Sequence, residues 1–536
     1  MTLGILLRRN FELSNIVKTC QILLCLLLCV AIWFFFLTRF VWGYTLDDAY
    51  ITLRYASNFI EGWGLTFNKN QPPIEGYTSF LWILFMACAH MFQLDAIVVS
   101  KVLGVLFAIL ATVVISVGVY TAEKDSERLF RATGALTGSV LFLSFPYSAV
   151  HAVSGMETSL AAFLVACVIM LSIMAIQENR AGILLPLFCL LLGLTRPEAN
   201  IICLFSTTLT AICIRKGLRG RFVRSCLMLY ALPWIAYFLW RSYYYNAVFP
   251  LPFYVKSAKF GLPGLAPTFT FYTNIGVGFV FPIVFSLIFA TWRSLRIFVP
   301  VLSVLFYLLT VDQMQGFADR YYYPYLPGLS VLAGIGITSL AASCKPSSSQ
   351  RVCKAFVPLF MALVVAIACG RAYASAPLYR SYGDGWARAH VLLGRAISSI
   401  SWSSGDPLLI IGDAGAVPYF SGMKTIDSYG LNDPVIARNF RMDRSSYVLS
   451  MEPELIVLAS KRADGFKSPL FYEGSLYKAC VESGYNRSVT FPFARDYHLW
   501  VMWRGGGADS STIEKALLPA SMRSKAIFQQ ALARGE

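Results

Sequence analysis

Residues 17–55 read VKTCQILLCLLLCVAIWFFFLTRFVWGYTLDDAYITLRY, a long apolar run that is followed closely by two adjacent acids. About 20 consecutive apolar residues are enough for a helix to cross a bilayer, and this run reaches that length. It is too long for the apolar region of a secretion signal and lacks a small-residue cleavage site, so we expect a retained membrane helix. Acids beside hydrocarbon are costly, which makes Asp47 and Asp48 candidates for function.

Similar apolar runs recur along the chain as far as about residue 371. Of the 536 residues, 57% are apolar and 14% are charged, whereas a soluble domain has about 25% charged residues. This composition excludes a single water-soluble globule and a disordered chain. It predicts a mainly α-helical, polytopic membrane protein. About eleven transmembrane helices are expected near residues 16–41, 95–120, 132–150, 157–177, 181–195, 198–214, 225–244, 272–292, 297–312, 324–343 and 355–371.

The positive charges set the expected orientation. The chain has 45 Lys and Arg against 29 Asp and Glu, a formal net charge of +16. Basic clusters lie in short connections between the apolar runs, where such an excess marks the cytoplasmic side. All of them fall on one side if the run 77–92 lies at the outer surface without crossing. We therefore expect a cytoplasmic N-terminus, and basic runs that adjoin membrane spans do not favour nucleic acid as a partner.

The composition changes at about residue 372, after which the chain resembles a soluble domain. Short apolar runs, such as 408–411 and 455–458, alternate there with Gly, Pro and Asp turn signals. We expect a transmembrane domain over 1–371, with a first outer loop at 43–94. A small extracytoplasmic α/β or α+β domain is expected over 372–536.

In this topology several polar segments reach the same outer face. The spacing i, i+3, i+7 puts Asp47, Tyr50 and Arg54 on one side of a helix that begins at Asp47. A helix cap with a surface ion pair explains the same residues without a function. The acids expected at this face are Asp47, Asp48, Glu75, Glu157, Glu198 and Asp319, and the bases are Arg54, Arg196, Arg241 (with Tyr243 beside it), Lys256 and Arg320.

Together these residue types fit a sugar linked to a lipid phosphate. Arg and Lys side chains neutralise a phosphate, a carboxylate takes the proton of an attacking hydroxyl, and Tyr rings stack on sugars. Asp47 and Asp48 are also candidates to hold a divalent cation, Mg²⁺ or Mn²⁺, on the leaving phosphate. No other cofactor is indicated.

The order of the motifs resembles that of the GT-C membrane glycosyltransferases. It looks most like the branch of the mycobacterial terminal arabinofuranosyltransferases and related bacterial lipid-phosphate-sugar transferases. The motifs are DDAYITLRYASNFIEGWGLTFNKNQPPIEGYTSFLW (47–82), SGMETSL (154–160), TRPEA (195–199), YYYNAVFPLPFYVKSAK (243–259), GFADRYYYPYLP (316–327) and GDAGAVPYFSGMKTIDSYGLND (412–433).

The resemblance implies an inverting transfer of a sugar, such as arabinofuranose, from a polyprenyl-phosphate donor. The acceptor would be a glycan, lipid or protein of the cell envelope, at the outer face of the bacterial cytoplasmic membrane. It implies Asp47 as general base, with Asp48 and Glu75 as further catalytic acids. Matched or neighbouring donor-site positions are Tyr50, Arg54, Glu157, Arg196, Glu198, Arg241, Tyr243, Lys256, Asp319 and Arg320. Tyr50 departs from the small or apolar residues usual in the arabinofuranosyl branch, which leaves the sugar open.

Two other functions stay open at this point. A transporter or flippase for a lipid-linked solute would also place charges in a membrane cavity, but it predicts inverted repeats, and none is visible. A non-enzymatic envelope assembly factor would use the domain 372–536 to bind partners. The segment 413–433 is either a motif that packs this domain on the membrane part or a binding loop.

Overall fold

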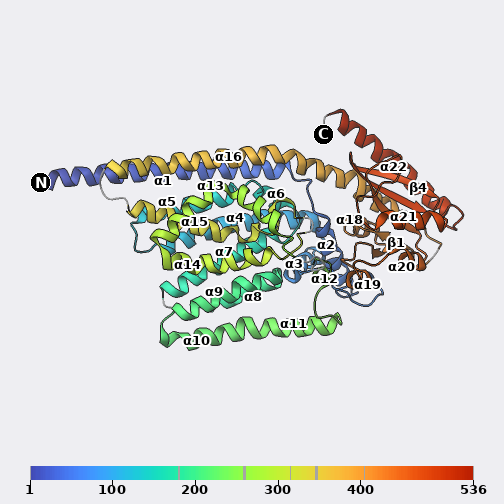
Figure 1. Ribbon diagram of the computed structural model, residues 1–536, viewed down its shortest axis with the longest axis horizontal. Coiled ribbons are helices and arrows are strands. Elements are labelled where there is room, and N and C mark those ends of the chain that lie inside the picture. Colours follow the sequence, from blue (N-terminus) through green and yellow to red (C-terminus); the bar gives the residue numbers. More distant parts are fainter. Residues whose placement is uncertain are drawn as a thin grey trace.

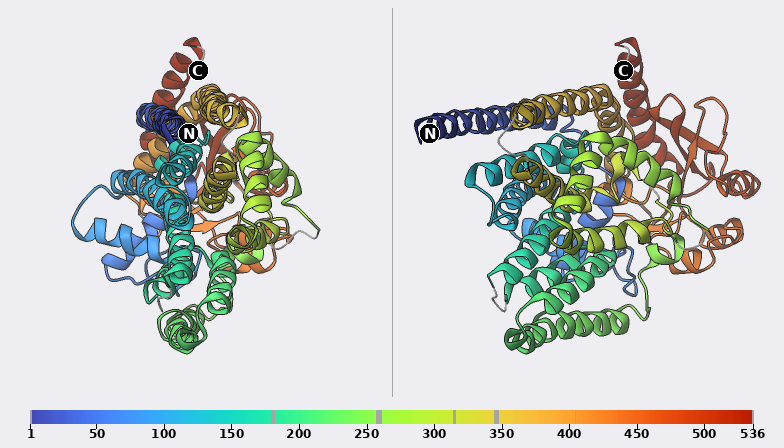
Figure 2. Two further views of the ribbon diagram at one scale, coloured as in Figure 1. Left: turned by 90° about the vertical axis from the view of Figure 1, so that its left-hand side faces the viewer. Right: turned by 60° about the vertical axis from the view of Figure 1, so that its left-hand side comes forward.

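The computed structural model describes residues 2–178, 182–256, 261–313, 316–343, 348–403 and 405–534. A body of roughly parallel helices carries a small sheet domain at the end away from the N-terminus (Figure 1). Helices α1 and α16 lie side by side along one edge of the body in every view (Figures 1 and 2). The helices of the body are α1 (Thr2–Phe40), α2 (Asp47–Ile60), α3 (Phe80–Met91), α4 (Ala96–Ala122), α5 (Arg128–Leu143), α6 (Ser148–Val153), α7 (Thr158–Gln177), α8 (Leu184–Thr195), α9 (Asn200–Cys213), α10 (Lys216–Cys226), α11 (Leu232–Tyr244), α12 (Leu251–Lys256), α13 (Leu265–Phe289), α14 (Thr291–Leu308), α15 (Leu326–Ser343), α16 (Ser348–Trp386) and α17 (Leu392–Ser398).

Within the described residues, six helical stretches are long and apolar enough to cross a membrane. A seventh is counted if the bent pair Leu265–Gly276 and Gly278–Phe289 forms one span. The predicted count of eleven is not confirmed, because several expected spans are shorter helices. The six are Val17–Phe40, Ala96–Ala122, Thr158–Gln177, Lys216–Tyr244, Phe317–Ser343 and Val357–Ser398, and the shorter apolar helices are Phe80–Met91, Leu184–Thr195, Pro197–Cys213 and Ser294–Leu308.

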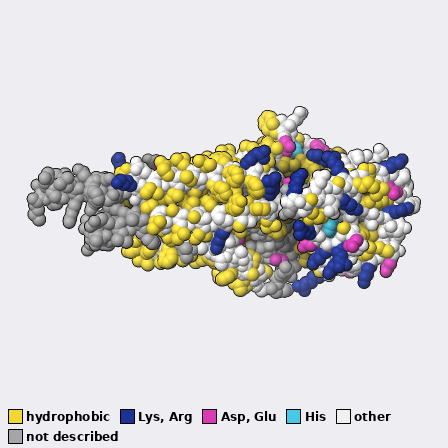
Figure 3. Space-filling model, turned by 90° about the horizontal axis from the view of Figure 1, so that it is seen from above, with side chains coloured by type: hydrophobic (Ala, Val, Ile, Leu, Met, Phe, Trp, Pro, Cys, Tyr) yellow, Lys and Arg dark blue, Asp and Glu magenta, His cyan; other side chains and the backbone are white. Residues whose placement is uncertain are grey.

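Large apolar side chains cover the outside of the helical body. Figure 3 shows hydrophobic side chains over most of its visible face, with Lys and Arg gathered toward the sheet domain. Ile32, Phe306 and Leu359 each have about 70% of their surface exposed, at 71%, 70% and 72%. An apolar surface of this extent is stable against hydrocarbon and not against water. The body is therefore that of an integral membrane protein.

The C-terminal part contains a five-stranded sheet in the order β2-β1-β3-β5-β4. The first three strands are parallel, and β5 pairs antiparallel with both β3 and β4. The small sheet domain expected from the sequence is thus present, although α16 runs on through residue 372, where the composition changes. The strands are β1 (Leu408–Ile411), β2 (Lys424–Asp427), β3 (Leu455–Ser460), β4 (Arg487–Ala494) and β5 (Tyr497–Trp503), and the helices are α18 (Ala416–Ser421), α19 (Pro434–Arg438), α20 (Ser445–Ser450), α21 (Glu473–Glu482) and α22 (Ser510–Ala533).

Helix α2 is fastened to this domain by two buried charged side chains. The Asp47 carboxylate accepts hydrogen bonds from the backbone N–H groups of Gly415 (3.0 Å) and Ala416 (2.9 Å). Two turns further along α2, the Arg54 guanidinium donates to the carbonyl oxygen of Met423 at 2.8 Å and to that of Pro418. The segment that connects β1 to β2 therefore rests on α2.

Gly415 is required by this close approach. A Cβ built on it would lie 2.3 Å from Oδ1 of Asp47 and 2.2 Å from the Asp47 carbonyl oxygen. No side chain fits at that distance unless the loop moves away from α2.

We expect the substitution Gly415→Ala to loosen the sheet domain from α2 and to destabilise the protein by about 1–3 kcal/mol, the usual cost of overpacking. A lower thermal unfolding midpoint of the purified protein in detergent would show this. Gly465→Ala is the matched control, because a Cβ there meets no atom within 4 Å. Equal midpoints for the two variants would contradict the close-packed contact.

Candidate active site

A narrow cavity lies where α2, the loop after Glu75, α12 and the N-terminal end of α7 meet. Its volume is about 50 Å³, room for a few water molecules. Two carboxylates, Asp48 and Glu157, and two cations, Lys256 and Arg320, line it. The sheet domain contributes Leu431 to the same lining. The cavity therefore brings together six separate segments of the chain, at residues 48–52, 76–79, 156–157, 252–256, 320 and 431.

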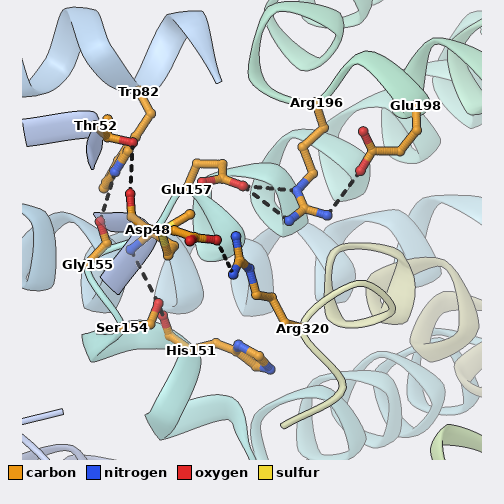
Figure 4. A network of polar contacts seen from close by, with 11 residues as sticks. Asp48, Thr52, Trp82, His151, Ser154, Gly155, Glu157, Arg196, Glu198 and Arg320 are labelled. Carbon is orange, nitrogen blue, oxygen red and sulfur yellow. Dashed lines mark hydrogen bonds and ion pairs between the residues drawn. The ribbon is translucent and has the colours of Figure 1, made fainter. Parts of the chain in front are cut away.

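The charged groups form one ion pair and one set of three residues, both drawn in Figure 4. Oδ2 of Asp48 accepts from Nη1 of Arg320 at 2.9 Å. Oε1 of Glu157 accepts from Nε and Nη2 of Arg196, at 3.2 and 3.1 Å, and Nη1 of Arg196 donates to Glu198 at 3.1 Å. Arg196 thus fixes the orientation of the Glu157 carboxylate, and Glu198 in turn holds Arg196 in place.

Three buried polar atoms of cavity-lining residues have no hydrogen-bond partner in the described chain, the Ser79 Oγ among them, and two belong to charged groups. Within the described residues, neither Oε2 of Glu157 nor Nε of Arg320 makes a hydrogen bond, and both are buried. A buried polar group without a partner costs about 1–3 kcal/mol, so such atoms are uncommon in a structural core. They supply one acceptor and one donor for a bound molecule.

The backbone before Arg320 is held in an unusual conformation. Ala318 and Asp319 have φ angles of 59° and 58°, a region that non-glycine residues rarely adopt. His151 stabilises this turn, because its Nε2–H donates to the Ala318 carbonyl oxygen at 2.6 Å and its ring lies 4.4 Å from that of Tyr323. Burial lowers the pKa of His151 to about 3, so the imidazole stays neutral. The turn aims Arg320 at Asp48.

The segment Ser154–Glu157 is packed directly on the start of α2. The Leu46 N–H donates to the Ser154 carbonyl oxygen at 3.0 Å, and the Trp82 indole N–H donates to that of Gly155, also at 3.0 Å. Gly155 has φ of 80°, and a Cβ on it would lie 2.9 Å from Cβ of Ala49. These contacts bring Glu157 beside Asp48, although the two residues are far apart in the sequence.

A loop of the sheet domain closes the cavity from the other side. The Asp427 carboxylate accepts from the N–H groups of Tyr429, Gly430 and Asn432 at 2.9, 3.0 and 2.9 Å, which fixes the turn 428–433. This turn packs on Gly76, where a Cβ would lie 1.9 Å from Oδ1 of Asn432, and places Leu431 in the lining. Sequence reasoning missed Asp427 and Leu431 as site components, although the motif 412–433 contains both.

Asp47, predicted as the general base, is not among the cavity-lining residues. It is 3% exposed, and each of its carboxylate oxygens accepts a backbone N–H from the sheet domain. Burial, with Asp413 nearby, raises the pKa of Asp47 well above its ordinary value, although the two N–H groups oppose the rise. Asp47, Tyr50 and Arg54 do share one face of α2, but that face meets the sheet domain.

Tyr50 and Arg54 therefore do not lie at the candidate donor site. The Tyr50 ring packs among Trp386, Tyr419 and Phe420, at centroid distances of 6.4, 5.8 and 5.7 Å. The Arg54 guanidinium donates hydrogen bonds to three carbonyl oxygens and to Oδ1 of Asn68 (3.1 Å). Arg54 does not line the cavity.

Glu75 and Arg241 neutralise each other away from the cavity. The Arg241 Nε donates to both Glu75 oxygens at 3.1 and 3.0 Å, and a second nitrogen also contacts the carboxylate. Burial raises the pKa of Glu75, although Arg241 opposes this. Tyr243 is 90% exposed on α11, and Asp319 accepts from Asn274 at 2.7 Å. None of these four lines the cavity, and residues 257–260, which include the end of the motif 243–259, lie outside the described part.

The two aspartates predicted to hold a divalent cation have different partners. The Asp47 carboxylate accepts from the sheet domain, and that of Asp48 accepts from Arg320. Among the described residues there is no group of three or more His, Cys, Asp or Glu suited to a metal. Asp48 and Glu157 are the two carboxylates that face the cavity, and a divalent cation on them stays a prediction.

Comparisons with known proteins agree with this architecture. Residues 386–514 match the model of a domain of unknown function, DUF8728, and no curated protein sequence matches the chain. ArnT from Cupriavidus metallidurans bound to undecaprenyl phosphate is similar in structure, with a TM-score of 0.56 at 14% identity over 88% of this chain and 97% of that one. Its apo form gives 0.53 at 15% identity over the same shares.

The oligosaccharyltransferase of Archaeoglobus fulgidus gives a TM-score of 0.47 at 12% identity, over 90% of this chain and 73% of that one. The likeness to ArnT, which is a GT-C glycosyltransferase, shows that this chain has the same fold. The GT-C fold predicted from the motifs is thus confirmed, whereas the arabinofuranosyltransferase branch is not.

We expect His151 to make the protein acid-sensitive. Because its pKa is lowered in the folded state, the stability it gives is present above pH 6.5 and is lost as the pH falls toward 3. At pH 4 the loss amounts to about 3 kcal/mol.

The variant His151→Gln keeps an N–H donor for Ala318 but cannot take up a proton. Thermal midpoints measured between pH 7 and 4 should therefore fall less for the variant than for the wild type. Parallel curves for the two proteins would show that His151 titrates normally and does not hold the turn as a neutral donor.

Proposed function

We propose that this protein is an inverting glycosyltransferase that moves a sugar from a polyprenyl-phosphate donor to a hydroxyl of a cell-envelope glycan, lipid or protein. The observation that carries the proposal is the meeting of two carboxylates and two cations in one cavity. Such a reaction needs a base for the acceptor hydroxyl and positive charge for the leaving phosphate. The GT-C fold, and the undecaprenyl phosphate bound by ArnT, support the same class of donor.

Asp48, and not Asp47, is the general base in this proposal. The Asp48 side chain is 19% exposed to the cavity side and is oriented by Arg320, whereas Asp47 is held by the sheet domain. Asp48 takes the proton of the acceptor hydroxyl as its oxygen attacks the anomeric carbon. The bond from that carbon to the phosphate oxygen breaks, and its electron pair leaves with the polyprenyl phosphate. Attack opposite the leaving group inverts the anomeric centre.

Lys256 and Arg320 receive the phosphate. Their charged groups lie 5.5 and 5.9 Å from the centroid of the Tyr321 ring, and both residues line the cavity. Glu157 offers its unpartnered oxygen to a sugar hydroxyl. The active site would face the outer side of the cytoplasmic membrane, and an arabinofuranosyl donor remains the prediction drawn from the motifs.

The variants Asp48→Asn and Asp47→Asn distinguish the two assignments. Asp48→Asn should reduce transfer by about 10²–10⁴-fold in a protein that stays folded, because the base is lost while the amide oxygen can still accept from Arg320. Asp47→Asn should lower the midpoint, because an amide leaves one acceptor for two N–H groups. Transfer is measured with a panel of polyprenyl-phosphate sugars that includes arabinofuranose.

Full activity of a folded Asp48→Asn protein would overturn the role of Asp48. Loss of all transfer in Asp47→Asn, with an unchanged midpoint, would restore Asp47 as the base. The panel identifies the sugar independently of both outcomes.

The substitution Lys256→Met should raise the KM for the donor about tenfold or more, because a charged contact with phosphate contributes about 1.5–3 kcal/mol. The KM for the acceptor should change little. Lys69→Met serves as control, since Lys69 lies in an exposed ion pair with Glu61. Equal effects of both variants on donor KM would show that Lys256 does not contact the phosphate.

A further inference from the structure

A second and much larger cavity lies between the end of α16, α17 and the C-terminal helix α22. Its volume is about 820 Å³, which is within the range of ligand sites. Five guanidinium groups and a single carboxylate line it. They are Arg380, Arg388, Arg395, Arg523 and Arg534, with Asp384. We call this cavity the arginine groove.

The arginine groove begins at the membrane boundary. The stretch Val357–Ser398 has 42 residues, about 63 Å of helix, which is twice the hydrocarbon thickness of about 30 Å. Its second half must therefore lie outside the hydrocarbon. The Arg380 guanidinium lies 4.9 Å from the ring of Phe40, the last residue of the span Val17–Phe40. Arg380 thus marks the level at which the spans end.

Aromatic contacts hold two further arginines in the groove wall. The Arg395 guanidinium lies over the Phe420 ring at 5.4 Å, and that of Arg388 lies over Phe528 at 5.1 Å. Such contacts reduce the side-chain entropy lost when a guanidinium binds an anion. Between the arginines the lining is apolar, with Leu392 and Ile527 among its members. The groove is therefore both basic and apolar.

We propose that the arginine groove binds the phosphate-bearing head group of a lipid from the adjoining membrane leaflet. One carboxylate cannot neutralise five guanidiniums, and Arg matches the geometry of phosphate oxygens better than any other side chain. Basic clusters beside a membrane attract anionic lipids, and the apolar lining suits the first carbons of their chains. The groove is separate from the candidate active site, so this inference does not depend on the proposed reaction.

Two double variants on α22 and its end test the proposal with equal changes in charge. Arg523→Glu with Arg534→Glu alters the groove, whereas Lys515→Glu with Lys525→Glu alters exposed positions that do not line it. The full-length proteins are titrated in detergent with phosphatidylglycerol or phosphatidylcholine, and bound lipid is counted by native mass spectrometry. Wild type should retain phosphatidylglycerol in preference, and the arginine variant should bind it at least about tenfold more weakly. The lysine variant should stay within about twofold of wild type.

A polyprenyl phosphate is titrated in the same way, to show whether the groove prefers it or the phospholipid phosphatidylglycerol. Binding of either lipid that depends on the arginines supports the proposal. Equal weakening by both double variants would overturn it, because net charge alone would then explain binding. Displacement of phosphatidylglycerol by water-soluble glycerol phosphate at similar concentration would also overturn it, in favour of a soluble anion. If the arginine variant unfolds at a lower temperature, Arg523→Gln with Arg534→Gln replaces it, with the same expected order.

Discussion

The contact between the Asp47 carboxylate and two backbone N–H groups of the sheet domain is the constraint on which the site depends. A carboxylate at the first turn of α2 is favoured by the helix dipole, but its burial is costly without donors. Gly415 and Ala416 supply those donors, and only glycine fits at the first position. Once this face of α2 is covered, the next residue, Asp48, is turned about 100° away and faces the cavity.

Elsewhere too, a buried charged group whose hydrogen-bonding atoms all have partners holds the structure together, whereas one that keeps an atom without a partner is a candidate for function. Glu75 is matched by Arg241, and Arg54 is surrounded by carbonyl oxygens, so these groups hold loops in place. At the cavity the hydrogen bonding of the charged groups is incomplete. Glu157 and Arg320 each retain one polar atom without a partner in the described chain. A molecule bound in the cavity would complete these hydrogen bonds.

Much of the architecture could be predicted from the sequence, because apolar runs and turn signals are local properties. The membrane body and the small sheet domain were indicated by patterns of that kind, and the GT-C fold by the resemblance of the motifs to a known family. Asp48, Glu157, Lys256 and Arg320 were also among the predicted site residues, and they do meet. What could not be predicted is which of two adjacent aspartates faces the cavity, because that depends on a domain placed on α2 from 368 residues away.

Pairings between distant segments explain the other differences. Glu75 and Arg241 are 166 residues apart, and no local pattern shows that they neutralise each other. The helical spacing of Asp47, Tyr50 and Arg54 identified a shared face but not what covers it. The arginine groove, likewise, needs α16 and α22 to meet, and each helix alone has an ordinary number of charges. Span counts differ because helix length depends on breaks, such as that at Gly276, as well as on hydropathy.

The long separation between Asp47 and Gly415 has a consequence for biosynthesis. A ribosome adds about 5–20 residues per second, so the donors for Asp47 emerge roughly 20–70 s after the carboxylate itself. During that interval the Asp47 carboxylate lacks these two donors, and the cavity lacks the wall that Leu431 provides. The candidate site therefore assembles only after residue 431 of the 536 has been made, and a chain released earlier would lack this wall of the cavity.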